Sequence, residues 1–170
     1  MSSPTKLYWD SGAWLGLVNG EPGRKEALEA IYGQARHRIV EIWTSTLSIV
    51  EANRLSSEVH MPKPVPPDSL AILDNLLFQE FVKLIPVDTV IARDARTLVR
   101  ETPKLQKKAD AVHLASAIRW SVPVLHTYDG NDLLHLDGKF SCRDGSLLTI
   151  CEPQNPSGGL FDLAPGQSRA

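Results

Sequence analysis

Short apolar segments alternate with stretches of helical periodicity along most of this chain. Segments rich in β-branched and aromatic residues predict strands over 6–9, 39–46, 81–87, 123–127 and 147–151. Apolar residues at helical spacing predict helices over 13–18, 24–36, 47–59, 68–80, 89–101 and 107–121. Strands that alternate with helices favour an α/β fold, in which helices cover both faces of a parallel sheet.

The length of 170 residues fits one domain, which we place at residues 1–152. Within it, residues 61–67 read Met-Pro-Lys-Pro-Val-Pro-Pro and cannot form a regular helix or a central strand. We therefore predict a loop there. Residues 153–170 contain Asn-Pro-Ser-Gly-Gly and Pro-Gly-Gln-Ser, a composition that predicts a disordered C-terminal tail.

Composition narrows the class of protein. Hydrophobic residues make up 42% of the chain and charged residues 22%, as in ordinary soluble globular domains. The net charge of -2 gives no global positive field, which argues against a DNA-coating protein but not against an enzyme with a local basic rim. Cys142 and Cys151 have no zinc-like spacing. With no secretory signal and no membrane-spanning apolar run, we expect a cytoplasmic protein without membrane contact.

Two aspartates follow predicted strands. Asp10 comes directly after the first strand and Asp129 shortly after the fourth, so both belong at the carboxyl edge of a parallel sheet, where ligands bind. Each could equally be an ordinary turn or helix N-cap residue. Asp132 lies three residues after Asp129 and is either an auxiliary ligand or a solvated acid.

Two further carboxylates lie at the margins of predicted apolar stripes. Asp110 borders the stripe of the predicted 107–121 helix, and Glu51 borders the stripe of the predicted 47–59 helix. A carboxylate near a core is unfavourable unless it is paired or binds a cation. The alternative to a functional site is therefore a buried salt bridge with an arginine such as Arg54 or Arg119.

Taken together, these carboxylates favour a metal site. Several carboxylates that converge at one sheet edge repel one another unless a counter-charge is present. Oxygen ligands of this kind suit Mg²⁺ or Mn²⁺. Two such ions can activate a water and stabilise a leaving oxygen, which is the chemistry of phosphodiester hydrolysis.

At these residues the sequence resembles the PIN-domain family. The resemblance lies in Leu-Tyr-Trp-Asp-Ser (7–11), Ser-Ile-Val-Glu-Ala (48–52), Lys-Ala-Asp-Ala-Val-His-Leu-Ala-Ser-Ala (108–117) and Leu-His-Thr-Tyr-Asp (125–129). It implies a three-layer α/β/α fold with a central parallel sheet. It also implies a catalytic set of Asp10, Glu51, Asp110 and Asp129. Of these we expect Asp10, Asp110 and Asp129 to bind the metal, with Ser11, Thr127 and Asp132 in support.

The compact form resembles most the VapC-type toxins of toxin–antitoxin pairs. That resemblance implies a Mg²⁺- or Mn²⁺-dependent endoribonuclease with an RNA substrate, an antitoxin partner and a homodimeric state. The alternative is a non-catalytic PIN module that binds RNA or a protein partner. A phosphatase of the haloacid-dehalogenase type is disfavoured, because that class needs an Asp-x-Asp motif after its first strand. Here Asp10 is followed by Ser11 and Gly12.

Several other residues invite a function but have an ordinary interpretation. His113 is one turn after Asp110, and a capping or packing role is expected for it. Trp9 and Trp14 could stack on bases, although such residues more often fill the core. The segment 93–119 carries seven basic and three acidic side chains, an excess that either guides an RNA backbone or forms a solvated helix face.

Overall fold

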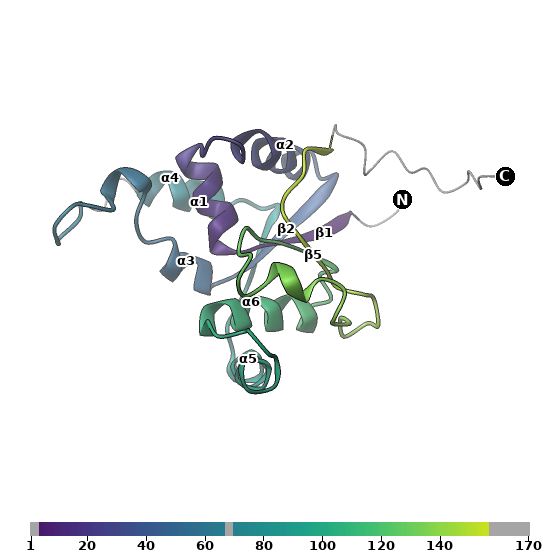
Figure 1. The fold of residues 1–170 in the computed structure, drawn as a ribbon. Helices are drawn as coiled ribbons and strands as arrows, with labels where there is room; N and C mark the ends of the chain where they lie inside the picture. Colours follow the sequence, from purple (N-terminus) through teal and green to yellow (C-terminus); the bar gives the residue numbers. More distant parts are fainter. Residues whose placement is uncertain (1–3, 67–69, 157–170) are drawn as a thin grey trace.

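The computed structural model describes residues 4–66 and 70–156. Its centre is a five-stranded, all-parallel sheet with the strand order β3-β2-β1-β4-β5 (Figure 1). The strands are β1 (Thr5–Trp9), β2 (Val40–Ser45), β3 (Val82–Ile85), β4 (Val124–His126) and β5 (Thr149–Cys151). The strand order reverses between β1 and β4, and ligands of open parallel sheets bind beyond the strand ends at such a point.

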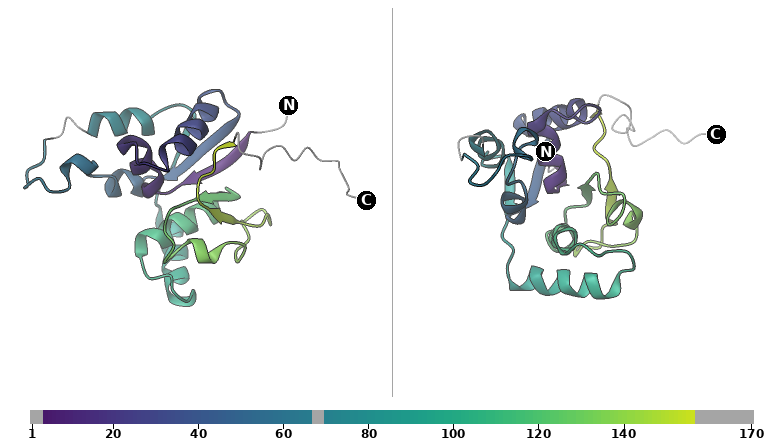
Figure 2. Two further views of the ribbon diagram at one scale, coloured as in Figure 1. Left: turned by 45° about the horizontal axis from the view of Figure 1, so that its top comes forward. Right: turned by 60° about the vertical axis from the view of Figure 1, so that its left-hand side comes forward.

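Helices cover both faces of the sheet, as predicted. They are α1 (Ser11–Asn19), α2 (Lys25–Arg36), α3 (Leu47–Glu51), α4 (Ala71–Leu77), α5 (Thr89–Glu101) and α6 (Lys108–Arg119). Helices α1, α2 and α4 lie on one side of the sheet, and α5 and α6 lie on the other (Figures 1 and 2). The predicted three-layer α/β/α arrangement with a parallel sheet is therefore confirmed.

Alternation along β1 creates two cores. Leu7 and Trp9 pack against α1, α2 and α4, whereas Tyr8 between them packs against α6 and its neighbours. Successive strand residues point to opposite faces, so a strand buried on both sides reads as an unbroken apolar run. Trp9 and Trp14 have 0% exposure and contact each other edge to face, which makes them core residues rather than base-stacking platforms.

Local sequence accounts for the boundaries of α5. The carboxylate of Asp88 accepts a hydrogen bond from the backbone N–H of Ile91 at 2.9 Å, as an N-cap residue does. Arg100 lies in the last turn, where a cation is favourable. The predicted range 89–101 matches the observed helix.

One predicted helix is wrong. The segment 47–59 forms only α3, which ends at Glu51, and a 3-10 helix at Ser56–Glu58. The Asn53 amide donates to the Val50 carbonyl, and the Arg54 guanidinium donates to the carbonyls of three residues in the following turn. Val59 is 55% exposed, so the apolar stripe expected for this segment does not exist.

The predicted 68–80 helix and the predicted C-terminal tail both include residues that lie outside the described chain. The predicted 68–80 helix is observed as the shorter α4 (Ala71–Leu77), and residues 68 and 69 of the predicted range lie outside the described chain. Of the predicted tail, 157–170 also lies outside the described residues, while Pro153 is buried just after β5.

Among the helices of the described ranges, none is long and apolar enough to cross a membrane.

Candidate functional site

Asp10 links the end of β1 to the start of α1. Its side chain is the N-cap of α1, because Oδ1 accepts the Ala13 N–H at 3.0 Å. A Cβ at Gly12 would lie 3.3 Å from the same oxygen, so the tight turn suits glycine. Asp10 is 5% exposed. The N-cap alternative for this residue is correct as a contact, and the Thr127 side chain is a second hydrogen-bond partner of the carboxylate.

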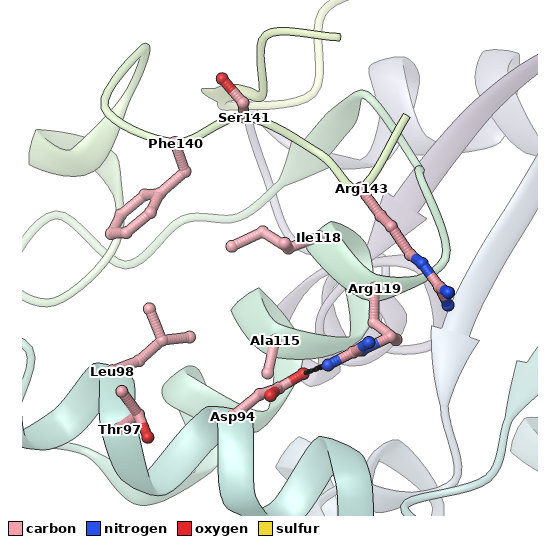
Figure 3. Close-up of a pocket in the computed structure, with 9 residues that line it drawn as sticks. All are labelled: Asp94, Thr97, Leu98, Ala115, Ile118, Arg119, Phe140, Ser141 and Arg143. Carbon is pink, nitrogen blue, oxygen red and sulfur yellow. Dashed lines mark hydrogen bonds and ion pairs between the residues drawn. The ribbon is translucent and has the colours of Figure 1, made fainter. Parts of the chain in front are cut away.

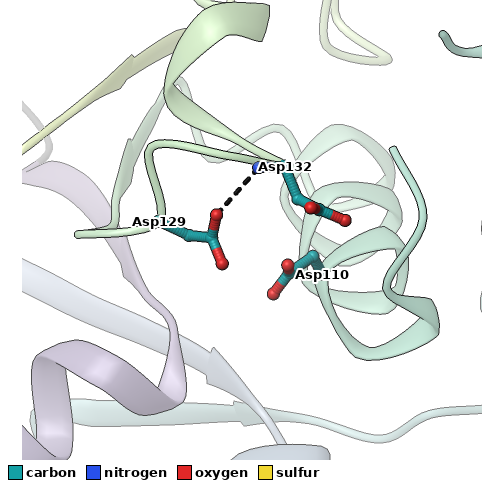
Figure 4. Close-up of side chains that lie close together, drawn as sticks. All are labelled: Asp110, Asp129 and Asp132. Carbon is teal, nitrogen blue, oxygen red and sulfur yellow. Dashed lines mark hydrogen bonds between the residues drawn. The ribbon is translucent and has the colours of Figure 1, made fainter. Parts of the chain in front are cut away.

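Three carboxylates from two segments lie side by side at the carboxyl edge of the sheet (Figure 4). Asp110 comes from the first turn of α6, while Asp129 and Asp132 follow β4. One oxygen from each lies within 4.8 Å of the others, a spacing compatible with one cation. Asp10 is not in this closest group, although its charge is near enough to raise the pKa of Asp110.

The Asp110 carboxylate is incompletely satisfied. This residue is 9% exposed, and within the described chain its buried Oδ2 has no hydrogen-bond partner. Buried polar atoms without a partner are rare and unfavourable. A bound divalent cation would satisfy this oxygen, so the residues present fit a Mg²⁺ or Mn²⁺ ion.

Asp129 is oriented by the backbone around it. Its Oδ1 accepts the N–H groups of Asn131 at 2.9 Å and Asp132 at 2.8 Å. Its own N–H donates to Thr127 Oγ1 at 3.0 Å, and the Thr127 hydroxyl also lies against Asp10. Oδ1 of Asp129 is thus held by its own turn, and Thr127 links the two aspartates.

Asp132 is a buried structural acid. Its Oδ2 accepts the backbone N–H groups of Gln106 at 2.8 Å and Lys107 at 2.7 Å, directly before α6 begins. The residue is 6% exposed, so the solvated-acid alternative is wrong. By fixing the entrance of α6, Asp132 places Asp110 opposite Asp129.

Lys107 supplies the counter-charge of the site. Its ammonium forms an ion pair with Oδ2 of Asp129 and lies 3.8 Å from Oδ2 of Asp110. The side chain is 56% exposed, so this charge stands at the mouth of the site. The ammonium of Lys107 therefore balances part of the negative charge of Asp110 and Asp129.

The pKa values follow from this arrangement. Burial, together with the nearby charge of Asp129, raises the pKa of Asp110 to about 6, although Lys107 opposes the shift. Burial also raises the pKa of Asp10. For Asp129, burial is outweighed by the hydrogen bond and charge of Lys107, and its pKa is lowered. Asp10 and Asp110 are thus hard to ionise, and a cation bound beside them would stabilise their charged forms.

Glu51 reaches the site from the last residue of α3. Its carboxylate lies 2.6 Å from Nε2 of the fully buried His113. Burial alone would raise the pKa of Glu51, but the hydrogen bond from His113, together with Ser11 and the charge of Lys107, outweighs it, and the pKa is lowered. Glu51 is therefore held as a carboxylate beside Ser11, one of the expected supporting residues.

The arginines proposed as partners of Asp110 and Glu51 are engaged elsewhere. Arg54 donates to backbone carbonyls. Arg119 forms an ion pair with Asp94 of α5 at 2.5 Å, beside a pocket of about 430 Å³ (Figure 3). None of the residues that line this pocket belongs to the predicted site. The alternative of a buried salt bridge between these acids and Arg54 or Arg119 is therefore wrong.

Comparison with known proteins agrees with this architecture. The family model described as PIN domain matches residues 7–139. The chain belongs to the PIN domain family. The match includes Asp10, Glu51, Asp110 and Asp129, and it confirms the family predicted from the motifs.

Two solved structures illustrate the likeness of this PIN domain to others. VapC20 from Mycobacterium tuberculosis, described as a toxin that cleaves the sarcin–ricin loop, gives a TM-score of 0.56 at 15% identity. The match covers 74% of this chain and 91% of VapC20. VapBC2 from Rickettsia felis, described as bound to a DNA fragment of its promoter, gives a TM-score of 0.55 at 14% identity. That match covers 86% of this chain and 97% of the VapBC2 chain. At such low identity the likeness establishes the fold. No curated protein sequence matches the chain.

Two residues of this PIN domain site were not anticipated in their present roles. His113, expected to be a packing residue, bonds directly to Glu51. Lys107, considered only as part of a basic segment, contacts two of the carboxylates. The available signal was their spacing from Asp110, at three residues before and three after. It places Lys107 at the N-cap of α6 and His113 one turn along the helix, both near Asp110.

Proposed function

We propose that this PIN domain is a divalent-metal-dependent endoribonuclease. The observation that carries the proposal is the buried Oδ2 of Asp110, which lacks a hydrogen-bond partner and faces other carboxylates at the carboxyl edge of the sheet. An acid held only for structure would be expected to have its oxygens satisfied, as Asp132 has for Oδ2. A cation between these groups removes both the repulsion and the unsatisfied atom.

Asp10, Asp110 and Asp129 would hold Mg²⁺ or Mn²⁺, with Asp132 fixing the position of Asp110. When bound, the metal supplies an activated water and neutralises charge that develops on the phosphate. Glu51 remains ionised beside the site and can accept a hydrogen bond from a water. Thr127 keeps Asp10 and Asp129 in register.

An RNA substrate is supported by the basic surface of α5 and α6. Within the described ranges, five basic side chains on this surface form no ion pair: Arg93, Arg96, Arg100, Lys104 and Lys108. A groove of about 260 Å³ between the two helices has an apolar floor of alanines and valines, with Arg96, Arg100 and Lys108 at its rim. Unpaired cations beside apolar surface suit the phosphates and bases of a single strand.

We further propose that the chain is the toxin of a toxin–antitoxin pair and forms a homodimer. Two features support protein partners. Lys107 already places a cation against Asp129, so a partner's arginine could bind the same carboxylates with a bidentate fork. Large apolar side chains are also exposed on α3, the following loop and α4: Val50, Val59, Met61, Ile72 and Phe78.

The test of the nuclease proposal is cleavage of unstructured and structured RNA by purified protein. Wild type should cleave with Mg²⁺ or Mn²⁺ and stop when a chelator is added. Asp110→Asn should lose activity, while Glu26→Gln, an equivalent neutralisation on exposed α2, should retain it. Cleavage that survives the chelator, or that Asp110→Asn leaves unchanged, excludes the mechanism. RNA binding without any cleavage by wild type would instead favour a non-catalytic PIN module.

A further inference from the structure

A chain of hydrogen bonds runs from the sheet to the rim of the site. The backbone N–H of Ser45, the last residue of β2, donates to the Tyr8 hydroxyl at 3.1 Å. That hydroxyl lies 2.8 Å from Nδ1 of His113, and Nε2 of His113 lies 2.6 Å from the Glu51 carboxylate. Tyr8 and His113 both have 0% exposure. Residues from β1, β2, α6 and α3 are thus joined in one connected series.

The positions of the hydrogens follow from the bonding partners. Ionised Glu51 can only accept, so Nε2 of His113 must donate to it. The Tyr8 oxygen already accepts the Ser45 N–H, and its own hydrogen can go to Nδ1 if that nitrogen is bare. If Nδ1 carried a hydrogen, that nitrogen could no longer accept from the Tyr8 hydroxyl. The network therefore selects the tautomer of His113 that carries its hydrogen on Nε2.

Glu51 depends on this donor for its orientation. It ends a helix of only five residues, too short to be stable by itself, and the chain leaves helical geometry directly afterwards. By contrast, His113 lies in the middle of the twelve-residue α6, and its ring also contacts the Tyr8 ring edge to face at 5.7 Å. His113 is thus the more firmly anchored partner of this hydrogen bond.

We propose that Tyr8 and His113 are positioning residues: Tyr8 fixes the tautomer of His113, and His113 directs the Glu51 carboxylate into the site. The inference rests on the proposed nuclease function for its consequence in catalysis, but not for the hydrogen-bond network itself. Second-layer partners of this kind are ordinarily worth about 10- to 100-fold in activity. His113 would not touch the substrate.

The first experiment is nitrogen NMR of the labelled imidazole in metal-free wild-type protein. We expect Nε2 of His113 to be protonated and Nδ1 to be bare. Tyr8→Phe should move the Nδ1 resonance, because it deletes the donor. Tyr32→Phe is the matched control: it also deletes one phenol hydrogen bond, to the Leu76 carbonyl at 3.0 Å, but in the other core. A protonated Nδ1 in wild type, or an Nδ1 resonance that Tyr8→Phe does not move, overturns the proposal.

The second experiment compares His113→Gln with His113→Met in RNA cleavage. The two side chains have nearly the same size, but only glutamine can donate to Glu51 from the position of Nε2. We expect the methionine variant to lose about tenfold or more in kcat, with KM little changed, and the glutamine variant to recover most of that loss. Equal kcat values for the pair overturn the positioning role. If wild type cleaves no RNA, the nuclease proposal fails, and the NMR result alone decides whether the network exists.

Discussion

Nζ of Lys107 lies 3.8 Å from Oδ2 of Asp110, so a positive charge stands beside a buried carboxylate oxygen that has no hydrogen-bond partner. The same ammonium forms an ion pair with Asp129. A divalent metal held by these two aspartates would need the space on their inner side, and it would have to share or displace this contact. We therefore predict that Lys107 competes with a divalent metal for these two carboxylates.

Replacement of Lys107 by methionine should tighten the binding of Mn²⁺. The lysine side chain is 56% exposed, so we take about 1 kcal/mol for its contact with the carboxylates, and the dissociation constant should fall by about fivefold. Titration calorimetry of the purified protein gives this constant. Lys108→Met is the control, because that neighbouring lysine has no ion pair in the described chain. Equal affinities for wild type and Lys107→Met would show that the lysine does not compete.

Neutralisation of Asp110 should stabilise the metal-free protein, and more so at higher pH. The folded pKa of Asp110 is raised to about 6, above the unfolded value. The folded state therefore binds the proton more tightly, and stability is lost as pH rises from the unfolded pKa through about 6. The free energy of unfolding of Asp110→Asn relative to wild type should therefore increase by about 1 kcal/mol from about pH 5 to about pH 7.5.

The measurement is thermal unfolding of both proteins with chelator at the two pH values. His126, whose pKa burial lowers to about 4, destabilises the protein as pH falls, but it does so equally in both proteins. The difference between the two proteins removes this common effect. A difference in melting temperature that is the same at both pH values would mean that Asp110 does not titrate in this range.

The positions of single acids along the chain could be predicted from the sequence, whereas their contacts could not. Asp10 after β1 and Asp110 at the margin of α6 follow from strand length and from helical period. The contact between Glu51 and His113 joins residues 62 positions apart. Such a contact depends on how α3 and α6 meet across the sheet, and no local pattern records it.

The failed prediction of a long helix after β2 has a similar cause. Ala52, Leu55 and Val59 have helical spacing, but spacing alone does not show which side chains the fold buries. In the structure Ala52 is buried and Val59 is exposed, and Arg54 bonds to the carbonyls of a turn rather than extending a helix. Tertiary contacts decided the conformation of a segment whose local preference was weak.

RNA binding should depend on the basic surface of α5. We expect Arg96→Ala combined with Arg100→Ala to weaken the binding of a single strand in the Asp110→Asn background, in which cleavage does not interfere. Each lost phosphate contact makes the negative slope of log affinity against log salt less steep by about 0.7. The slope of the double variant should therefore be less steep by about 1.4. Arg36→Ala, on α2 at the opposite face, should leave the slope unchanged. An unaltered slope in the double variant would place the RNA elsewhere.

Expression of this chain without a partner should slow the growth of its host, if it is a toxin. Asp10→Asn removes a proposed metal ligand while it keeps the N-cap of α1, because asparagine caps a helix nearly as well as aspartate. Cells that express this variant should therefore grow normally. Growth curves at matched levels of soluble protein measure the effect, with Glu26→Gln expected to behave as wild type. Normal growth with the wild-type chain would argue against the toxin proposal, but not against the nuclease.

We propose above all that the carboxylate site hydrolyses RNA with a metal-activated water. Cleavage in water labelled with heavy oxygen, followed by mass spectrometry of the products, tests it most directly. Attack by water breaks one phosphorus–oxygen bond and leaves the labelled oxygen on the new terminal phosphate. We predict this label on the terminal phosphate of every phosphate-ended product that Mn²⁺-loaded wild type forms, while the other fragment of each cleavage keeps an unlabelled hydroxyl. Asp110→Asn should form no product. Products that end in an unlabelled 2′,3′-cyclic phosphate would contradict the claim, because the attacking group would then be the RNA's own hydroxyl.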